Sequence, residues 1–244
     1  MDSRLIPNVS VDCVVFGFDL NTLNVLLVER VMEYEAVTYT DLKLPGDLVR
    51  WDEDIDKAAV RILFDLSGLS NIYLKQFHSF GDVNRLKGEA RDLVWLKAID
   101  HPEERVITMA YFSLLDLSDN ANNQYILQSN ARWVPVYQLP HLAFDHGEIV
   151  MKALENLRIE IKQKPLAFEL LPLKFTLTQL QKLYEVVLGT TYDKRNFRKK
   201  IGQISYVVPI NEKQTNVAHK PARLYMFSRD IYEKTHKDSF DFTV

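Results

Sequence analysis

The chain has 244 residues, of which 47% are hydrophobic and 26% charged, so we expect one or two globular domains with a substantial core. No run approaches the roughly 20 apolar residues of a membrane span, and the first residues lack a basic segment leading into an apolar one, so neither a membrane protein nor a secreted protein is expected. The single cysteine, Cys13, excludes an internal disulfide and fits a reducing cytoplasm.

Charge is distributed unevenly along the chain. Residues 162–229 hold 13 Lys or Arg against 4 Asp or Glu, a net charge of +9, so the overall charge of −3 leaves −12 for the rest. A basic C-terminal third on an acidic body indicates that one end of the molecule meets a polyanion.

Short apolar and aromatic runs in the first 160 residues predict strands, and two longer periodic segments predict helices. Residues 9–18 and 24–29 are joined by a polar turn, which predicts a hairpin. Further strands are expected at 75–81, 106–117 and 131–136, and helices at 54–67 and 145–162. This mixture is typical of an α+β domain.

A spaced set of residues within 46–69 resembles the Nudix box. Five positions fall in register with it: Glu53, Arg61, Leu63, Gly68 and Leu69. Asp47 replaces the first glycine of the box, and its three metal-binding carboxylates are replaced by Ile62, Asp65 and Leu66. The segment is therefore similar to a Nudix box that has lost its metal site.

The loss has a direct chemical consequence. A Nudix hydrolase needs several carboxylates on this helix face, because Mg²⁺ takes hard oxygen ligands and must polarise a pyrophosphate and its attacking water. One aspartate, Asp65, is a poor site, and Ile62 and Leu66 adjoin the apolar stripe of 54–67, which predicts packing surface. The alternative is an accidental match on an ordinary amphipathic helix, but the flanking residues 44–46 also fit the box.

Residues 145–148, Asp-His-Gly-Glu, invite a reading as a metal or acid–base site. They lack a partner cluster at metal-ligand spacing, and Asp145 is better explained as the N-cap of the helix that follows. We therefore expect no metal, cofactor or catalytic residue here.

The segment 162–165 is charged and ends in proline, so we place a boundary there, between an N-terminal domain of residues 1–162 and a C-terminal domain of 165–244. The sequence of the C-terminal domain predicts three helices and a hairpin. The helices are expected at 167–171, at 177–188 with a capping box from Thr176 and Gln179, and at 194–204 with Asp193 as N-cap; the strands are expected at 206–210 and 222–227. This is the layout of a winged helix-turn-helix.

The helix 194–204 is the sharpest feature of this domain. Phe197, Ile201 and Ile204 mark a buried face, and basic and amide side chains lie on the other. Such a face can enter a major groove, where Arg reads guanine and Asn reads adenine, although a solvated basic face is the common alternative. The candidate DNA-binding residues are Lys194, Arg195, Asn196, Arg198 and Lys199 on the helix, and Lys220 and Arg223 at the wing, beside Lys213 and His219.

Several further segments resemble the Nudix-related transcriptional regulators. They are 139–146 (LPHLAFDH), 170–172 (LLP), 175–177 (FTL), 183–185 (LYE), 193–199 (DKRNFRK) and 221–225 (PARLY). The resemblance covers nearly the whole chain. It implies a Nudix-like mixed-sheet α/β/α sandwich that binds an effector, followed by a winged helix that binds operator DNA as a homodimer.

Members of that family respond to ADP-ribose-like nucleotides or to a pentose such as L-arabinose, and they regulate NAD metabolism or sugar catabolism. The missing carboxylates, and an insertion at 85–105 that brings Trp95 to the expected pocket mouth, favour a small sugar and a role in carbohydrate metabolism. Trp95 serves equally well as an anchor for the insertion. The candidate effector-binding residues are Lys43, Glu53, Asp82, Arg85 and Trp95.

Two other functions stay open at this point. One is an active Nudix hydrolase of nucleoside diphosphate derivatives, which the residues Ile62 and Leu66 disfavour. The other is a scaffold that binds no DNA, which would leave the basic helix idle. The sequence does not reveal the effector, the operator, or whether the ligand releases DNA or promotes its binding.

Overall fold

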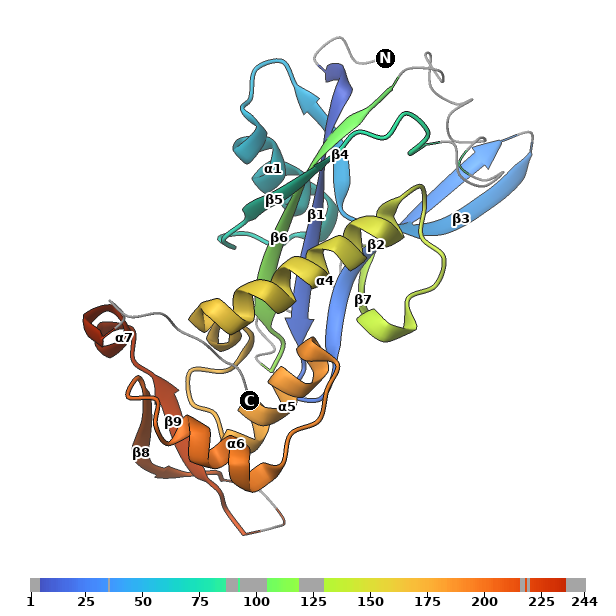
Figure 1. Cartoon of the computed structure of the whole chain (residues 1–244). Helices are drawn as coiled ribbons and strands as arrows, with labels where there is room; N and C mark the ends of the chain where they lie inside the picture. The colour runs from blue at the N-terminus through green and yellow to red at the C-terminus, as the bar shows by residue number, and fades with distance from the viewer. Residues whose placement is uncertain are drawn as a thin grey trace. The chain divides into compact units, whose positions relative to one another are not determined.

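The computed structural model describes residues 5–34, 36–86, 92, 105–118, 130–215, 218 and 220–235. Contacts divide the chain into two compact units (Figure 1). The first comprises residues 1–17, 24–114 and 120–154, and the second comprises 18–23, 115–119 and 155–244. Each unit has its own apolar core. The domain boundary expected at 162–165 stays a prediction.

The first unit is built on a seven-stranded sheet with the strand order β3-β2-β1-β6-β5, in which β4 also pairs with β1 and β7 with β2 (Figure 1). The strands are β1 (Leu5–Phe18), β2 (Leu23–Tyr34), β3 (Val37–Lys43), β4 (Gly46–Arg50), β5 (Lys75–Phe80), β6 (Ile107–Asp116) and β7 (Ala131–Pro135). The five predicted strands are confirmed. The sequence reasoning missed β3 and β4.

Helix α1 (Ile55–Ser67) carries the segment that resembles the Nudix box. The Asp54 carboxylate accepts a hydrogen bond of 2.8 Å from the Lys57 backbone N–H, and Gly68 ends the helix in the left-handed conformation at φ 73°. Ile62 is fully buried, so the first metal-ligand position of the box is part of the apolar core. The prediction that Ile62 packs into the core is confirmed.

Two adjacent residues of β1 show that helices cover both faces of the sheet. Cys13 lies 3.7 Å from the carbonyl oxygen of Ala59 in α1, and it is fully buried, as expected. Asp12 faces His146, the first residue of α4 (His146–Gln163). Because successive side chains of a strand point to opposite faces, α1 and the start of α4 lie on opposite sides of the sheet. The predicted α/β/α sandwich is confirmed.

The second unit contains the predicted winged helix-turn-helix. Its elements are η2 (Pro165–Leu170), α5 (Leu177–Leu188), α6 (Lys194–Ile201), β8 (Val207–Lys213), β9 (Arg223–Phe227) and α7 (Arg229–Thr235), while η1 (Val136–Gln138) follows β7 in the first unit. The sequence reasoning did not predict α7. The short helix expected at 167–171 is a 3-10 segment.

Capping residues set the start and end of α5 and the start of α6. The capping box of Thr176 and Gln179 is present, and Gly189 ends α5 at φ 67°. The Asp193 carboxylate accepts a hydrogen bond of 2.9 Å from the Asn196 backbone N–H at the start of α6. The prediction that α6 continues to residue 204 is wrong, because the helix ends at Ile201.

A cluster of aromatic rings holds the second unit together. Phe168 stacks on Phe227 with ring centroids 4.5 Å apart, and Tyr206 meets Phe227 edge to face at 5.8 Å. Phe175 exchanges two backbone hydrogen bonds, of 3.0 and 2.8 Å, with Tyr225 of β9. The hairpin is therefore fastened to the segment that precedes α5. In the described ranges of the chain, no helix is long and apolar enough to cross a bilayer.

Candidate DNA interface and effector region

Helix α6 presents its basic side chains to solvent because its apolar side is fixed in the core. Phe197 is fully buried, with its ring 6.2 Å from Tyr184 and 5.9 Å from Tyr192, and Ile201 is buried beside it. Ile204, expected on the same face, lies beyond the end of the helix and is half-buried. The two buried residues are enough to orient the helix.

All seven candidate DNA-binding residues are exposed: Lys194, Arg195, Asn196, Arg198, Lys199, Lys220 and Arg223. Among the described residues, no carboxylate pairs with the four basic side chains on the exposed part of α6. Three arginines of the first unit differ sharply, since Arg30, Arg61 and Arg85 are each ion-paired. The unpaired charges of α6 are therefore available to an external anion.

The wing is the hairpin of β8 and β9. Its strands are antiparallel, with an irregularity in register between Pro209 and Lys213. The Arg223 guanidinium donates to the carbonyl oxygen of Ile210 at 3.4 Å, and Lys220 is exposed near the tip. His219 lies outside the described residues. The prediction of a hairpin after the third helix is confirmed.

Glu53, a predicted effector contact, instead forms hydrogen bonds within the segment that resembles the Nudix box. Its two carboxylate oxygens accept hydrogen bonds of 2.8 and 2.5 Å from Arg61, and one of them also accepts from the Arg50 backbone N–H at 2.9 Å. The hydrogen bond from Arg61 lowers the pKa of Glu53, so this carboxylate stays ionised. Arg61 also donates to the carbonyl oxygen of Leu48 at 3.1 Å, which ties β4 to α1.

The three metal-ligand positions do not form a site for Mg²⁺. Ile62 is in the core, Leu66 is apolar and half-buried, and Asp65 is exposed with its carboxylate 3.7 Å from Arg61. Within the part of the chain that the structure describes, no three His, Cys, Asp or Glu side chains are grouped to hold a metal ion. One exposed, ion-paired carboxylate does not fit the octahedral oxygen set that Mg²⁺ demands.

A buried cluster of charges lies on the other face of the sheet, at the start of α4. Arg85 donates two hydrogen bonds of 2.8 Å to the carboxylate of Asp145, and one of its nitrogens is 3.7 Å from Asp12. All three side chains are at most 10% exposed. Asp145 precedes α4 as expected of an N-cap, but its carboxylate is committed to Arg85.

His146 is neutral in this cluster, and its proton is assigned by its neighbours. The Leu44 backbone N–H donates to Nδ1 at 2.9 Å, so the proton lies on Nε2, which faces Asp12 Oδ1 at 3.5 Å. Burial lowers the pKa of His146. Gly46 is required beside it, because a Cβ atom there would lie 1.8 Å from the same oxygen of Asp12.

The cluster continues into the hairpin of β2 and β3. Arg30 and Asp41 are directly opposite each other in the register and are joined by two hydrogen bonds, one of 2.8 Å. The Arg30 guanidinium also lies 4.9 Å from the ring centroid of Phe144 and 3.8 Å from Asp92. Lys43, half-buried nearby, donates to the carbonyl oxygen of Gly46 at 2.5 Å, and burial lowers the pKa of its ammonium.

The structure therefore brings two of the five predicted effector residues, Lys43 and Arg85, to one cluster. Glu53 belongs to the box, and Asp82 is exposed and accepts a hydrogen bond of 2.7 Å from the Asn84 backbone N–H in a turn. Trp95 lies outside the described residues. The role of these residues in effector binding is a prediction that this arrangement does not test.

The sequence reasoning missed three members of the cluster: Asp12, Arg30 and Asp41. Asp12 could have been recognised from the sequence, since a charged residue in the middle of an apolar strand must find a buried partner. Arg30 and Asp41 could not, because their pairing depends on the register between β2 and β3, and β3 was not predicted.

Comparison with known proteins decides the family. Residues 167–227 match the family model described as the NrtR DNA-binding winged helix domain. The chain is 30% identical over 232 residues to the ADPR responsive transcriptional repressor NtrR of Acinetobacter baylyi, an alignment that covers 93% of this chain and 84% of that protein. The chain belongs to the NrtR family.

Solved structures of an NrtR protein agree over nearly the whole length. NrtR of Shewanella oneidensis in complex with a 27mer DNA is 26% identical, with a TM-score of 0.69 and coverage of 92% of this chain and 95% of that one. A second crystal structure of S. oneidensis NrtR is 27% identical, with a TM-score of 0.68 and coverage of 96% of this chain and 98% of that one. The NrtR architecture, a Nudix-like domain followed by a winged helix, is therefore confirmed.

Proposed function

We propose that this chain is a ligand-responsive transcriptional regulator whose winged helix binds operator DNA and whose Nudix-like domain senses a nucleotide related to ADP-ribose. The observation that carries the DNA part is α6, a helix anchored through Phe197 whose exposed arginines and lysines have no acidic partner among the described residues. The S. oneidensis relative was solved in complex with DNA, which supports the same partner here.

Contacts divide between the helix and the wing in this proposal. Arg195 and Lys199, which project away from the buried Phe197, reach base edges or the phosphates beside them, and Lys220 and Arg223 meet phosphates. We also propose a symmetric homodimer, since a dimer on a palindromic operator places two recognition helices about one helical turn apart or a multiple of it.

The effector is a nucleotide rather than a pentose in this proposal. The A. baylyi relative is named for its response to ADPR, which favours an ADP-ribose-like ligand over L-arabinose and a role outside carbohydrate metabolism. Lys43 is the strongest contact among the predicted residues. No carboxylate in the described residues lies within ion-pair distance of it, whereas Arg85 and Glu53 are already paired. An anionic phosphate would form the direct ion pair that Lys43 lacks among the described residues.

Hydrolysis of that nucleotide is not part of the proposed function. The box offers only Asp65, exposed and paired with Arg61, where catalysis needs several oxygen ligands for Mg²⁺. The alternative function, hydrolysis of nucleoside diphosphate derivatives, predicts turnover with Mg²⁺ or Mn²⁺ that Asp65→Ala abolishes. We expect no turnover, and activity that survives purification and depends on Asp65 would establish the alternative.

DNA binding is tested by selecting duplexes from a random library with the full chain and measuring affinity for the enriched sequence. We expect an inverted repeat to be enriched and to bind more tightly than random DNA. The variant Arg195→Ala/Lys199→Ala should lose this preference while keeping its fold. A chain that enriches no sequence and binds duplex DNA no better than the variant would refute the proposal.

A further inference from the structure

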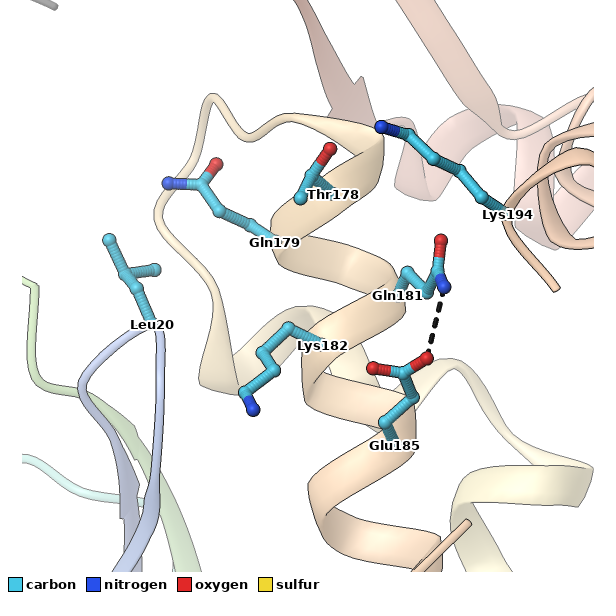
Figure 2. Close-up of a pocket in the computed structure, with 7 residues that line it drawn as sticks. All are labelled: Leu20, Thr178, Gln179, Gln181, Lys182, Glu185 and Lys194. Atoms are coloured by element: carbon cyan, nitrogen blue, oxygen red, sulfur yellow. Dashed lines mark hydrogen bonds between the residues drawn. The ribbon is translucent and has the colours of Figure 1, made fainter. Parts of the chain in front are cut away.

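The turn between α5 and α6 is held at one residue, Tyr192, by two side chains of α5. The Glu185 carboxylate accepts a hydrogen bond of 3.0 Å from the Tyr192 backbone N–H, and the Gln181 amide donates one of 2.9 Å to the Tyr192 carbonyl oxygen. Gln181 also donates to the Glu185 carboxylate at 3.0 Å, so each side chain orients the other (Figure 2). They are one helical turn apart on the same side of α5. Both polar backbone groups of Tyr192 are therefore fixed to α5.

Glu185 also takes part in ending α5. Its backbone carbonyl oxygen accepts hydrogen bonds from the backbone N–H groups of Gly189 and Thr190, the latter at 3.1 Å. Helix α5 is itself firmly placed in its unit, because Leu180 and Leu183 are fully buried. One residue of a fixed helix therefore determines both the end of that helix, through its main chain, and the path of the turn that follows, through its side chain.

Tyr192 is connected directly to the start of α6. The next residue, Asp193, is the N-cap of that helix, and the Tyr192 ring lies 5.9 Å from the ring of Phe197. Burial of Phe197 decides which side of α6 faces the core, but apolar contact has no direction and permits small rotations and shifts. Hydrogen bonds are directional, so those to Tyr192 fix where α6 begins and, with it, the position of Arg195.

We infer that Glu185, with Gln181, is a positioning residue for operator recognition, an inference that rests on the proposed function. By holding Tyr192, Glu185 sets the angle at which α6 presents Arg195 and Lys199 to base edges. A binding constellation must be held within about 0.5 Å and 10–20° of its productive geometry. A lysine on a phosphate tolerates more, because its stem is flexible and its three donors rotate. Loss of the Glu185 acceptor should therefore reduce sequence preference and spare general affinity for DNA.

The test uses the full chain and measures the ratio of its affinity for a selected operator to its affinity for a random duplex. Glu185→Ala and Glu185→Gln remove the same charge, but only alanine removes the acceptor for the Tyr192 N–H. Glu185→Ala should lower the ratio by at least about 5-fold, the lower end of what one base contact contributes to discrimination, with random-duplex affinity nearly unchanged. Glu185→Gln should keep the ratio. Glu233→Ala is the charge-matched control, since it removes an exposed carboxylate from α7.

The affinity ratio separates positioning from a loss of stability, because partial unfolding weakens both complexes by the same factor. A wild-type ratio in Glu185→Ala, or an equal loss in Glu185→Gln, would overturn the positioning role and leave DNA binding by α6 intact. Should Glu185→Ala fail to fold, Gln181→Ala decides, since it removes the bond to the Tyr192 carbonyl and keeps the bond to its N–H. A reduced ratio would then support the inference, and a wild-type ratio would overturn it. A wild-type chain that prefers no duplex sequence would overturn both proposals.

Discussion

Arg85 and Asp145 are 60 residues apart in the sequence and form a buried bidentate ion pair, with both guanidinium–carboxylate hydrogen bonds at 2.8 Å. The pair joins the segment that follows β5 to the residue that immediately precedes α4. Asp12 and His146 adjoin it, so the start of α4 is fixed by charge as well as by apolar packing.

Removal of Arg85 should destabilise the protein strongly. Arg85→Ala leaves Asp145 buried without its partner, and such a loss costs about 3–5 kcal/mol in the free energy of unfolding. Urea unfolding followed by circular dichroism measures it. Lys57→Ala is the control, because it breaks an ion pair to Asp54 that is mostly exposed and should have a far smaller effect. Equal destabilisation by the two variants would show that burial of the Arg85 pair contributes nothing special.

Gly46→Ala should also be strongly destabilising, for a steric reason. The new Cβ atom would lie 1.8 Å from the Asp12 carboxylate and 3.0 Å from the Val11 carbonyl oxygen, so a strand or the buried cluster must shift. We expect a cost of about 3 kcal/mol, at the upper end of overpacking effects. Gly147→Ala is the matched control, because no atom lies within 4 Å of its Cβ position and it lies in the helix α4. It should stabilise the protein by about 0.5–1 kcal/mol. If both variants had the same melting temperature, the close approach at Gly46 would be disproved.

His146 makes the stability of the protein depend on pH. Burial lowers its pKa in the folded protein below about 6.5, the value in an unfolded chain, so the unfolded chain binds more protons as the pH falls. Its contribution to stability is therefore present above about pH 6.5 and is lost at lower pH. The groups that face it are Asp12, Lys43, Asp145 and Arg85.

The variant His146→Asn tests this directly. Its side chain keeps an acceptor for the Leu44 N–H at the place of Nδ1 but does not titrate, so the free energy of unfolding should fall less steeply between pH 6.5 and 5. His141→Asn, which replaces an exposed histidine, is the control and should keep the wild-type slope. If His146→Asn and wild type lose stability in parallel over this range, the imidazole is not the titrating group.

Mutation can separate the base contacts proposed for α6 from the phosphate contacts proposed for the wing. Arg195→Ala should cost about 1–3 kcal/mol on the operator and relax sequence preference at one position, the effect of a lost bidentate base contact. Lys220→Ala should weaken operator and random DNA alike and flatten the salt dependence of log K by about one unit. Titrations of both variants against both duplexes distinguish these effects. Wild-type operator binding by Arg195→Ala would mean that α6 is not the reading helix.

The sequence predicted correctly those helices whose first and last residues are set by neighbouring capping residues. Helix α5 begins at the capping box of Thr176 and ends at Gly189 as expected, because both caps are made by residues within a turn of the helix. Strand β3 was missed because it is largely exposed and polar and gains its definition from pairing with β2. Helix α6 was predicted to be three residues too long, because the apolar Ile204 continues the helical spacing of apolar residues beyond the last helical residue, Ile201.

The buried charges could not have been assembled from the sequence. The partner of Arg85 lies 60 residues away, and that of Asp12 lies at the start of α4, on another element of the sandwich. Such pairs depend on strand order and register, which residue spacing does not encode. The exposed basic face of α6 was predictable, since Phe197 and Ile201 fix its orientation within a single helix.

The central claim, that a nucleotide bound to the Nudix-like domain controls DNA binding, is tested most directly by measuring operator affinity with and without ADP-ribose. Saturating ADP-ribose should change the Kd of the wild-type chain for the selected operator by at least about 5-fold, in the usual range for coupled sites. L-arabinose should leave it unchanged, and Lys43→Gln should reduce the response to ADP-ribose without altering Kd in its absence. An operator Kd that stays constant with ADP-ribose, or that responds to L-arabinose alone, would contradict the account.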